Sequence, residues 1–152
     1  MPRRVKRPSS HDELLNKLTD KEKGGIFETY KDVMLFAAAL AAYNAEQKPL
    51  QGKSSEPIDY NIFSKKSDNE ALIHLLAIYN RDDITILSDE NSDERVKILE
   101  EYANAGLDII DQKIRSSATT LDAILGLIQE TGEKNKVKER DFSDIAKYFK
   151  DH

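Results

Sequence analysis

The residues best suited to chemistry lie at the start of the chain. Four of the first seven side chains are cationic, with no acidic residue among them: Arg3, Arg4, Lys6 and Arg7. Guanidinium and ammonium groups bind phosphate oxygens, so this arm could contact the backbone of DNA. Pro8 follows and favours an extended arm over a helical one. The alternative is a charge run that aids only solubility. These four residues are the candidate DNA-binding site.

The rest of the chain has the opposite charge. The whole protein carries a formal net charge of −5, and residues 8–132 hold 13 basic and 23 acidic residues, a net charge of −10. An acidic body repels nucleic acid, whereas a basic arm can still hold phosphates. The acidic surface could instead mimic DNA, or compete with it, on a protein partner.

Catalytic groups are scarce. The sequence has no Cys and only three His residues, which are His11, His74 and His152. It contains no Gly-rich phosphate loop, no HExxH motif and no zinc-finger pattern. His74 has no His or Cys three or four residues away, which favours a structural histidine over a metal ligand. We therefore expect no catalytic residue, no metal site and no cofactor, and expect that the chain is not an enzyme.

One stretch has the spacing of a calcium-binding loop. Oxygen-bearing residues occupy positions one, three, five and twelve: Asp89, Asn91, Asp93 and Glu100. Position six of such a loop requires glycine for a sharp turn, and here it is Glu94. The sequence instead indicates the start of a helix with Ser92 as its N-cap. The adjacent carboxylates Glu100 and Glu101 point apart on a helix, so they are not a ready metal clamp.

Two long helices are expected to form the core. Residues 26–43, IFETYKDVMLFAAALAAY, are the longest nearly uncharged run, and apolar residues cover more than half of that helix surface. The helix expected from Asp93 to about Arg115 carries one apolar stripe and has Gly106 at its middle. A mid-helix glycine costs about 1 kcal/mol against alanine. It therefore suggests a close crossing, over the alanine face at residues 37–41.

Shorter elements complete the prediction. Capping boxes at Ser10–Glu13 and Ser67–Glu70 predict helices over 10–19 and 67–80. In the second helix, five residues are expected to face inward: Leu72, Ile73, Leu75, Leu76 and Tyr79. Residues 44–66 read as a long loop and a second possible partner site, with residues 58–63 docked as an extended segment or a helical turn. A helix over 121–129 is expected to end before Gly132.

The expected fold is all-α, a compact bundle of about five to six helices around the central apolar helix at 26–43. It divides into a basic N-terminal arm (1–9), a helical domain (10–132), and a charged linker with a short C-terminal amphipathic helix (133–152). No apolar run is long enough to span a membrane. The N-terminus lacks the apolar region of a signal peptide. With no Cys, these features predict a cytoplasmic protein without a membrane partner.

Three segments carry a resemblance to a known family: MPRRVKRP, IFETYKDVMLFAAAL and DERVKILEEYANAGLDII. Together they resemble the DNA phosphorothioation-associated protein 4 family, which accompanies the bacterial Dnd system, over most of residues 1–115. The resemblance implies a host-defence (antiviral) setting, in either DNA modification or phosphorothioate-dependent restriction of invading DNA.

A looser, fold-level similarity links the chain to DndE, a small helical member of the modification machinery. DndE pairs an alanine-containing apolar helix with a later helix that has Asn or Gly near its middle, as at Asn104 and Gly106 here. That similarity implies DNA binding by a homo-oligomer, without assigning particular lysines. Our leading hypothesis is a non-catalytic accessory protein that binds DNA, partner proteins of the system, or both. The alternative is a purely protein–protein adaptor or regulator with a DNA-mimicking surface.

Overall fold

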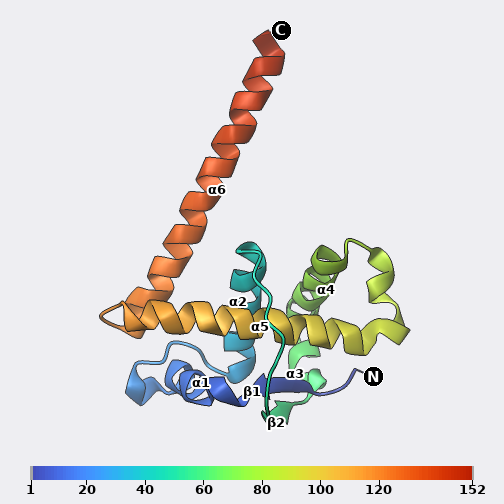
Figure 1. Cartoon of the computed structure of the whole chain (residues 1–152), viewed down its shortest axis with the longest axis vertical. Helices are drawn as coiled ribbons and strands as arrows, with labels where there is room; N and C mark the ends of the chain where they lie inside the picture. Colours follow the sequence, from blue (N-terminus) through green and yellow to red (C-terminus); the bar gives the residue numbers. More distant parts are fainter. Residues whose placement is uncertain (1, 152) are drawn as a thin grey trace.

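The computed structural model describes the backbone of residues 2–151, and the side chains of these residues except 135–146, 148, 149 and 151. Helices dominate the described chain, and two short strands accompany them (Figure 1): β1 (Val5–Pro8), α1 (Asp12–Thr19), α2 (Tyr30–Tyr43), β2 (Ser54–Ile58), α3 (Tyr60–Ser64), α4 (Ser67–Arg81), α5 (Ser92–Arg115) and α6 (Thr120–Asp151). The predicted all-α fold with about five to six helices is confirmed. The small sheet was not expected.

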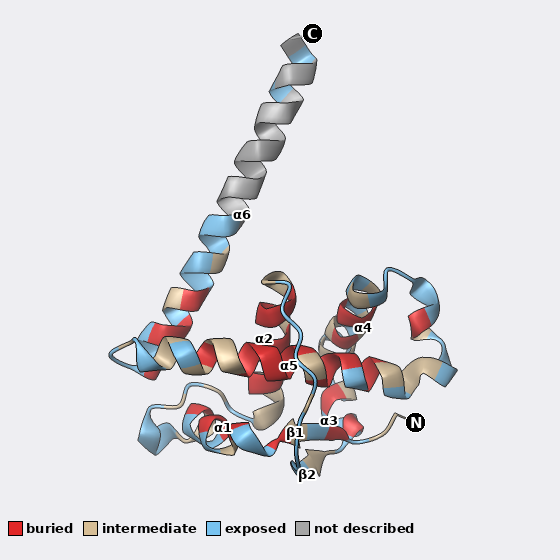
Figure 2. Cartoon of the chain, viewed as in Figure 1, coloured by how far each residue is buried: buried red, intermediate tan, exposed pale blue. Residues whose placement is uncertain are grey.

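The core lies where α2 crosses α5. Figure 2 shows both helices buried around their crossing, while the ends of α5 are more exposed. Eight of the fourteen residues of α2 are buried, as its nearly uncharged sequence predicts. α2 begins at Tyr30, with Thr29 as N-cap, so the predicted start at Ile26 is wrong. The backbone N–H groups of Gly25 and Phe27 bond back to Asp20 and Leu18, which holds this segment as a loop.

The predicted glycine crossing is confirmed. A Cβ atom placed on Gly106 would lie 1.8 Å from the carbonyl oxygen of Ala37 and 2.4 Å from its carbonyl carbon. Only hydrogen fits between the two backbones, so glycine is required at this position of α5. The alanines of α2 complete the close approach because they add little volume to that face.

The segment between α2 and α4 is ordered by three anchors. β2 pairs antiparallel with β1, and the register aligns Val5 with Ile58 and Pro8 with Ser54. Phe63 of α3 is fully buried. The side-chain amide of Asn104 on α5 donates to the carbonyl oxygens of residues 48 and 49, at 3.2 and 3.1 Å. The expectation that residues 58–63 dock on the body is confirmed for Ile58, Tyr60 and Phe63, but Ile62 is 44% exposed.

Three predicted helix N-caps are wrong. Ser10 lies in a 3-10 turn (Ser9–His11), and the N-cap of α1 is His11. Ser67 and Ser92 are instead the first residues inside α4 and α5. Each of these helices begins one residue away from the position that would let the serine cap it, and none of the three has a side-chain capping bond.

The predicted inward side of α4 is partly wrong. Ile73, Leu76 and Ala77 are buried, but Leu75 and Tyr79 are each 63% exposed. At 100° per residue, these two lie on the opposite side of the helix from the buried three. α4 packs through one narrow stripe, and its apolar sequence covers more of the surface than the body can bury.

α6 is longer than predicted. The helix does not end before Gly132, and residues 133–140, predicted as a charged linker, continue it to Asp151. Glu, Lys and Arg are good helix formers, and a single glycine costs only about 1 kcal/mol, so the helix can run through. The C-terminal amphipathic helix was predicted to present an apolar face. The side chains of that face lie outside the described residues, although the helical backbone there is described. No described helix is long and apolar enough to cross a membrane.

Candidate nucleic-acid interface

The basic arm is docked on the body through β1, and burial alternates over residues 3–7. Val5 is fully buried between the exposed residues Arg4 and Lys6, while Arg3 and Arg7 are half-buried. Alternation follows from strand geometry, because successive side chains point to opposite sides. An irregularity in the pairing lies between Val5 and Arg7. The four cations of the arm therefore form two classes, one turned toward the body and one toward solvent.

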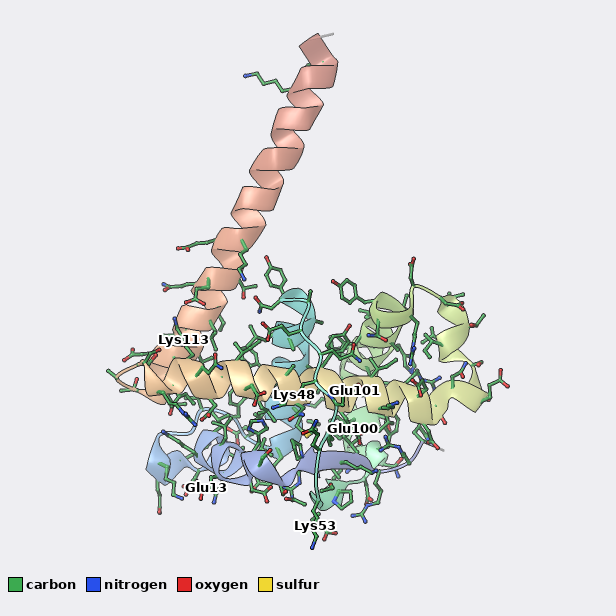
Figure 3. The ribbon with its side chains drawn as sticks, viewed as in Figure 1. Glu13, Lys48, Lys53, Glu100, Glu101 and Lys113 are labelled. Atoms are coloured by element: carbon green, nitrogen blue, oxygen red, sulfur yellow. The ribbon has the colours of Figure 1, made fainter. Side chains whose placement is uncertain are left out.

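Arg3 is anchored by a buried carboxylate on α5. Its Nη1 and Nη2 atoms each lie 2.7 Å from one oxygen of Glu100, in a two-pronged ion pair. The backbone N–H of Lys6 donates to the same carboxylate at 2.6 Å. Glu100 is only 3% exposed and projects from α5 toward β1 (Figure 3). Its hydrogen bond raises the pKa of Arg3 above the ordinary value. A charge-assisted fork of this kind fixes β1 in position.

Arg7 is the second anchor. Its guanidinium carbon lies 4.8 Å from the ring centroid of Tyr30, its Nε donates to the carbonyl oxygen of Glu56 at 2.8 Å, and its Nη1 lies 3.6 Å from a carboxylate oxygen of Asp12. The guanidinium thus lies on the start of α2 while bonding β2 and α1. With 12% of the side chain exposed, Arg7 ties three elements together and offers little surface to a ligand.

Arg4 is held much more loosely. It lies 3.1 Å from a carboxylate oxygen of Glu56 and 3.0 Å from one of Asp59, and donates to the carbonyl oxygen of Pro57 at 2.8 Å. The side chains of Arg4, Glu56 and Asp59 are 51%, 80% and 67% exposed. Ion pairs between exposed groups contribute only about 0–1 kcal/mol. A phosphate can therefore replace these carboxylates at little cost.

Lys6 is the free cation of the arm. Its ammonium group makes no ion pair with any described residue, and neither does that of Lys97 on α5, which is also exposed. The two lysines border one hollow of about 210 Å³, whose lining residues are Arg3, Lys6, Pro49, Leu50, Lys97, Glu100 and Glu101. Glu100 is already engaged by Arg3, so the ammonium groups of Lys6 and Lys97 face one further carboxylate in this lining, that of Glu101.

The buried histidine His11 lies in a cluster of charged side chains. His11 is buried, with its Nε2 atom 2.9 Å from a carboxylate oxygen of Asp108, and Lys48 holds the other oxygen at 2.7 Å. This cluster joins the start of α1 and the segment after α2 to α5. Among the described residues, no group of three or more His, Cys, Asp or Glu side chains could hold a metal ion.

Sequence reasoning identified the cations but missed two residues on α5. Glu100 lies between Val96 and Ala103, one helical turn from each, so it falls on the apolar stripe. A carboxylate at an inward position requires a cationic partner, so this position of Glu100 in the sequence was a signal from which a buried ion pair could have been predicted. Lys97 gave no such signal, because only the docking of β1 brings it beside Lys6.

These observations define a small all-α protein with a docked, cationic N-terminal strand. The chain belongs to the family of DNA sulphur modification system-associated protein 4, whose model matches residues 4–147. This confirms the resemblance seen in the sequence and associates the chain with a DNA sulphur modification system. No curated protein and no solved structure matches it.

Proposed function

We propose that this protein is a non-catalytic accessory component of a bacterial DNA phosphorothioation system, and that it contacts DNA through the solvent side of β1. It would act in the cytoplasm, in modification or in phage-directed restriction, together with other proteins of the system. The family assignment supports the setting. The observation that carries the DNA contact is the alternating burial of residues 3–7, which leaves Arg4, just before β1, and Lys6, within β1, exposed on a firmly anchored segment.

The four cations of the arm contribute in different ways. Arg3 and Arg7 are positioning residues, because their guanidinium groups are already bound to Glu100, Asp12 and Tyr30. Arg4 and Lys6 are the phosphate ligands, and Lys97 adds a third charge beside Lys6. A preformed strand loses little conformational entropy on binding, in contrast to a free arm that must first be ordered.

The surrounding carboxylates limit this contact to the backbone of DNA near β1. Residues 8–132 carry a net charge of −10, so the body as a whole repels DNA. Binding through two or three phosphates is weak and strongly dependent on salt, since each phosphate contact releases about one counterion. Such weak contact suits a subunit that is held near DNA by its protein partners.

The test is fluorescence anisotropy with a labelled DNA duplex at low and moderate salt. Lys6→Ala and Arg4→Ala are each expected to raise the Kd about 3–10-fold and to reduce the salt slope by about one. Lys17→Ala is the matched control, since Lys17 is an exposed lysine on α1 without an ion pair in the described chain. The proposal fails if the wild-type chain does not bind DNA at low salt, or if both variants bind as it does.

A second candidate function is an adaptor that binds only proteins. It is favoured by the outward side of α4, where Leu75 and Tyr79 are each 63% exposed on an acidic body. Pull-down of the other proteins of the system, in the presence of nuclease, separates the two functions. Partner capture that survives nuclease and is lost in Leu75→Asp, together with no DNA binding by the wild-type chain, would establish the adaptor.

A further inference from the structure

α6 has two apolar sides, and the body covers only one of them. Ala123, Ile124 and Leu127 are at most 5% exposed. By contrast, the exposed fractions of three other apolar residues are 49%, 48% and 51%, for Leu121, Leu125 and Ile128 respectively. Figure 2 shows buried and exposed residues mixed along the start of α6, and Figure 1 shows the helix leading away from the body. The exposed side of α6 is therefore an apolar surface without a partner in the described chain.

The spacing on this side matches one heptad of a coiled-coil seam. Leu121, Leu125 and Ile128 follow one another at intervals of four and three residues, which is the heptad pattern of a coiled coil. In the sequence, the same pattern recurs three heptads later, at Phe142, Ala146 and Phe149, after three intervening positions that are not apolar: Gly132, Asn135 and Glu139. A repeat of 3.5 residues keeps one side of a helix facing a partner helix.

The charges along α6 select the partner and its direction. Residues 120–133 contain three acidic residues and no basic one, a net charge of −3. Residues 134–151 contain six basic and four acidic residues, a net charge of +2. Two copies of this helix in parallel would align like charges, whereas antiparallel copies align the acidic half of one with the basic half of the other. The helix is thus complementary to itself, as an isologous two-fold interface requires.

The exposed apolar side of α6 continues into a groove on the body. Ile128 also borders an apolar groove of about 290 Å³ between α2 and α6, together with Phe36, Leu40 and Leu127. The hydroxyl group of Tyr43 closes one end of the groove by donating to the carbonyl oxygen of Thr131 at 3.2 Å. A helix lying along the exposed side of α6 would cover the mouth of this groove as well.

We propose that the chain forms a homodimer in which two α6 helices pack antiparallel through the side that carries Leu121, Leu125 and Ile128. The dimer carries two copies of the cationic β1 strand on separate bodies, joined through the α6 pair. This interface is independent of the DNA contact, because β1 and the exposed side of α6 share no residue.

Light scattering coupled to size-exclusion chromatography tests the dimer on the full chain. The wild-type chain is expected to elute as a dimer, and Leu125→Asp is expected to weaken dimerisation at least about a hundredfold, because it places a charge in an apolar seam. Leu75→Asp on α4 is the matched control and remains dimeric. Circular dichroism must show the same helix content in all three. A monomeric wild-type chain, including one that gains mass only with another protein of the system, overturns the proposal, as does a dimeric Leu125→Asp.

Distances between spin labels test whether the two α6 helices pack antiparallel or parallel. The sequence has no Cys, so Asp122→Cys, at an exposed position on α6, introduces a single spin-label site. At 1.5 Å per residue, antiparallel helices place the two labels roughly 30–45 Å apart, and parallel helices place them roughly 10–15 Å apart. Double electron–electron resonance measures this distance. Label distances of roughly 30–45 Å support the antiparallel pair, and distances of roughly 10–15 Å overturn it.

Discussion

Replacing Gly106 by alanine should separate the two central helices. The new Cβ atom would lie 1.8 Å from the carbonyl oxygen of Ala37, while ordinary contact begins at 3.4 Å, so α2 and α5 must move apart by about 1.6 Å locally. Overpacking costs about 1–3 kcal/mol, and the obstacle here is backbone, which places the cost at the upper end. Alanine regains about 1 kcal/mol of helix propensity.

The net expectation is a loss of about 2 kcal/mol in the free energy of unfolding, which for a chain of this length lowers Tm by about 4–8 °C. Urea unfolding followed by far-ultraviolet circular dichroism measures it. Gly132→Ala on α6 is the control, because nothing lies within 4 Å of its Cβ position, and it should be neutral or stabilising. Ala37→Gly should not rescue Gly106→Ala, because the clash involves only backbone atoms of Ala37. Unchanged or increased stability of Gly106→Ala would refute the crossing.

Two further predictions concern β1 and α3. Glu100→Gln breaks the two-pronged ion pair with Arg3. It should lower the free energy of unfolding by roughly 1–3 kcal/mol and speed hydrogen exchange at the Lys6 amide. Glu101→Gln makes the same charge change at the next residue and should have neither effect. Equal effects of the two variants would contradict the fork. Burial, reinforced by Glu70, raises the pKa of the Tyr60 phenol above its ordinary value of 10.0. The stability that the protonated Tyr60 phenol contributes is therefore complete below about pH 10 and is lost as pH rises through the higher folded-state pKa. Tyr60→Phe should thus reduce the fall in the free energy of unfolding that urea titrations measure above about pH 10. A fall as steep in the variant would show that other groups cause it.

The helical core was predictable because its signals are local or periodic. The uncharged run of α2, the single stripe of α5 and the glycine within that stripe together indicated both helices and their crossing. The small sheet was not predictable, since its two strands span only Val5–Pro8 and Ser54–Ile58 and neither is long enough for an alternating pattern. The exposure of Leu75 and Tyr79 was missed for a related reason, because a sequence pattern gives the apolar side of α4 but not how much of it the body can cover.

The candidate site divides in the same way. The residue types and the extended form of the arm followed from the sequence, and the four cations remain the predicted phosphate ligands or their supports. Which cations are engaged depends on Glu100, Asp12 and Tyr30, which become neighbours of the arm only in the folded chain. Lys97 joins the site for the same tertiary reason.

The contact between Arg3 and Glu100 also affects the order of events during synthesis. The two residues are separated by 97 positions, so Arg3 cannot reach its partner until α5 has left the ribosome. Until then only the contacts of Arg4 and Arg7 with residues 12–59 can form. A stop or break in the chain anywhere before Glu100 removes the carboxylate that anchors Arg3 and the backbone N–H of Lys6. Complete docking of the arm thus requires two thirds of the chain.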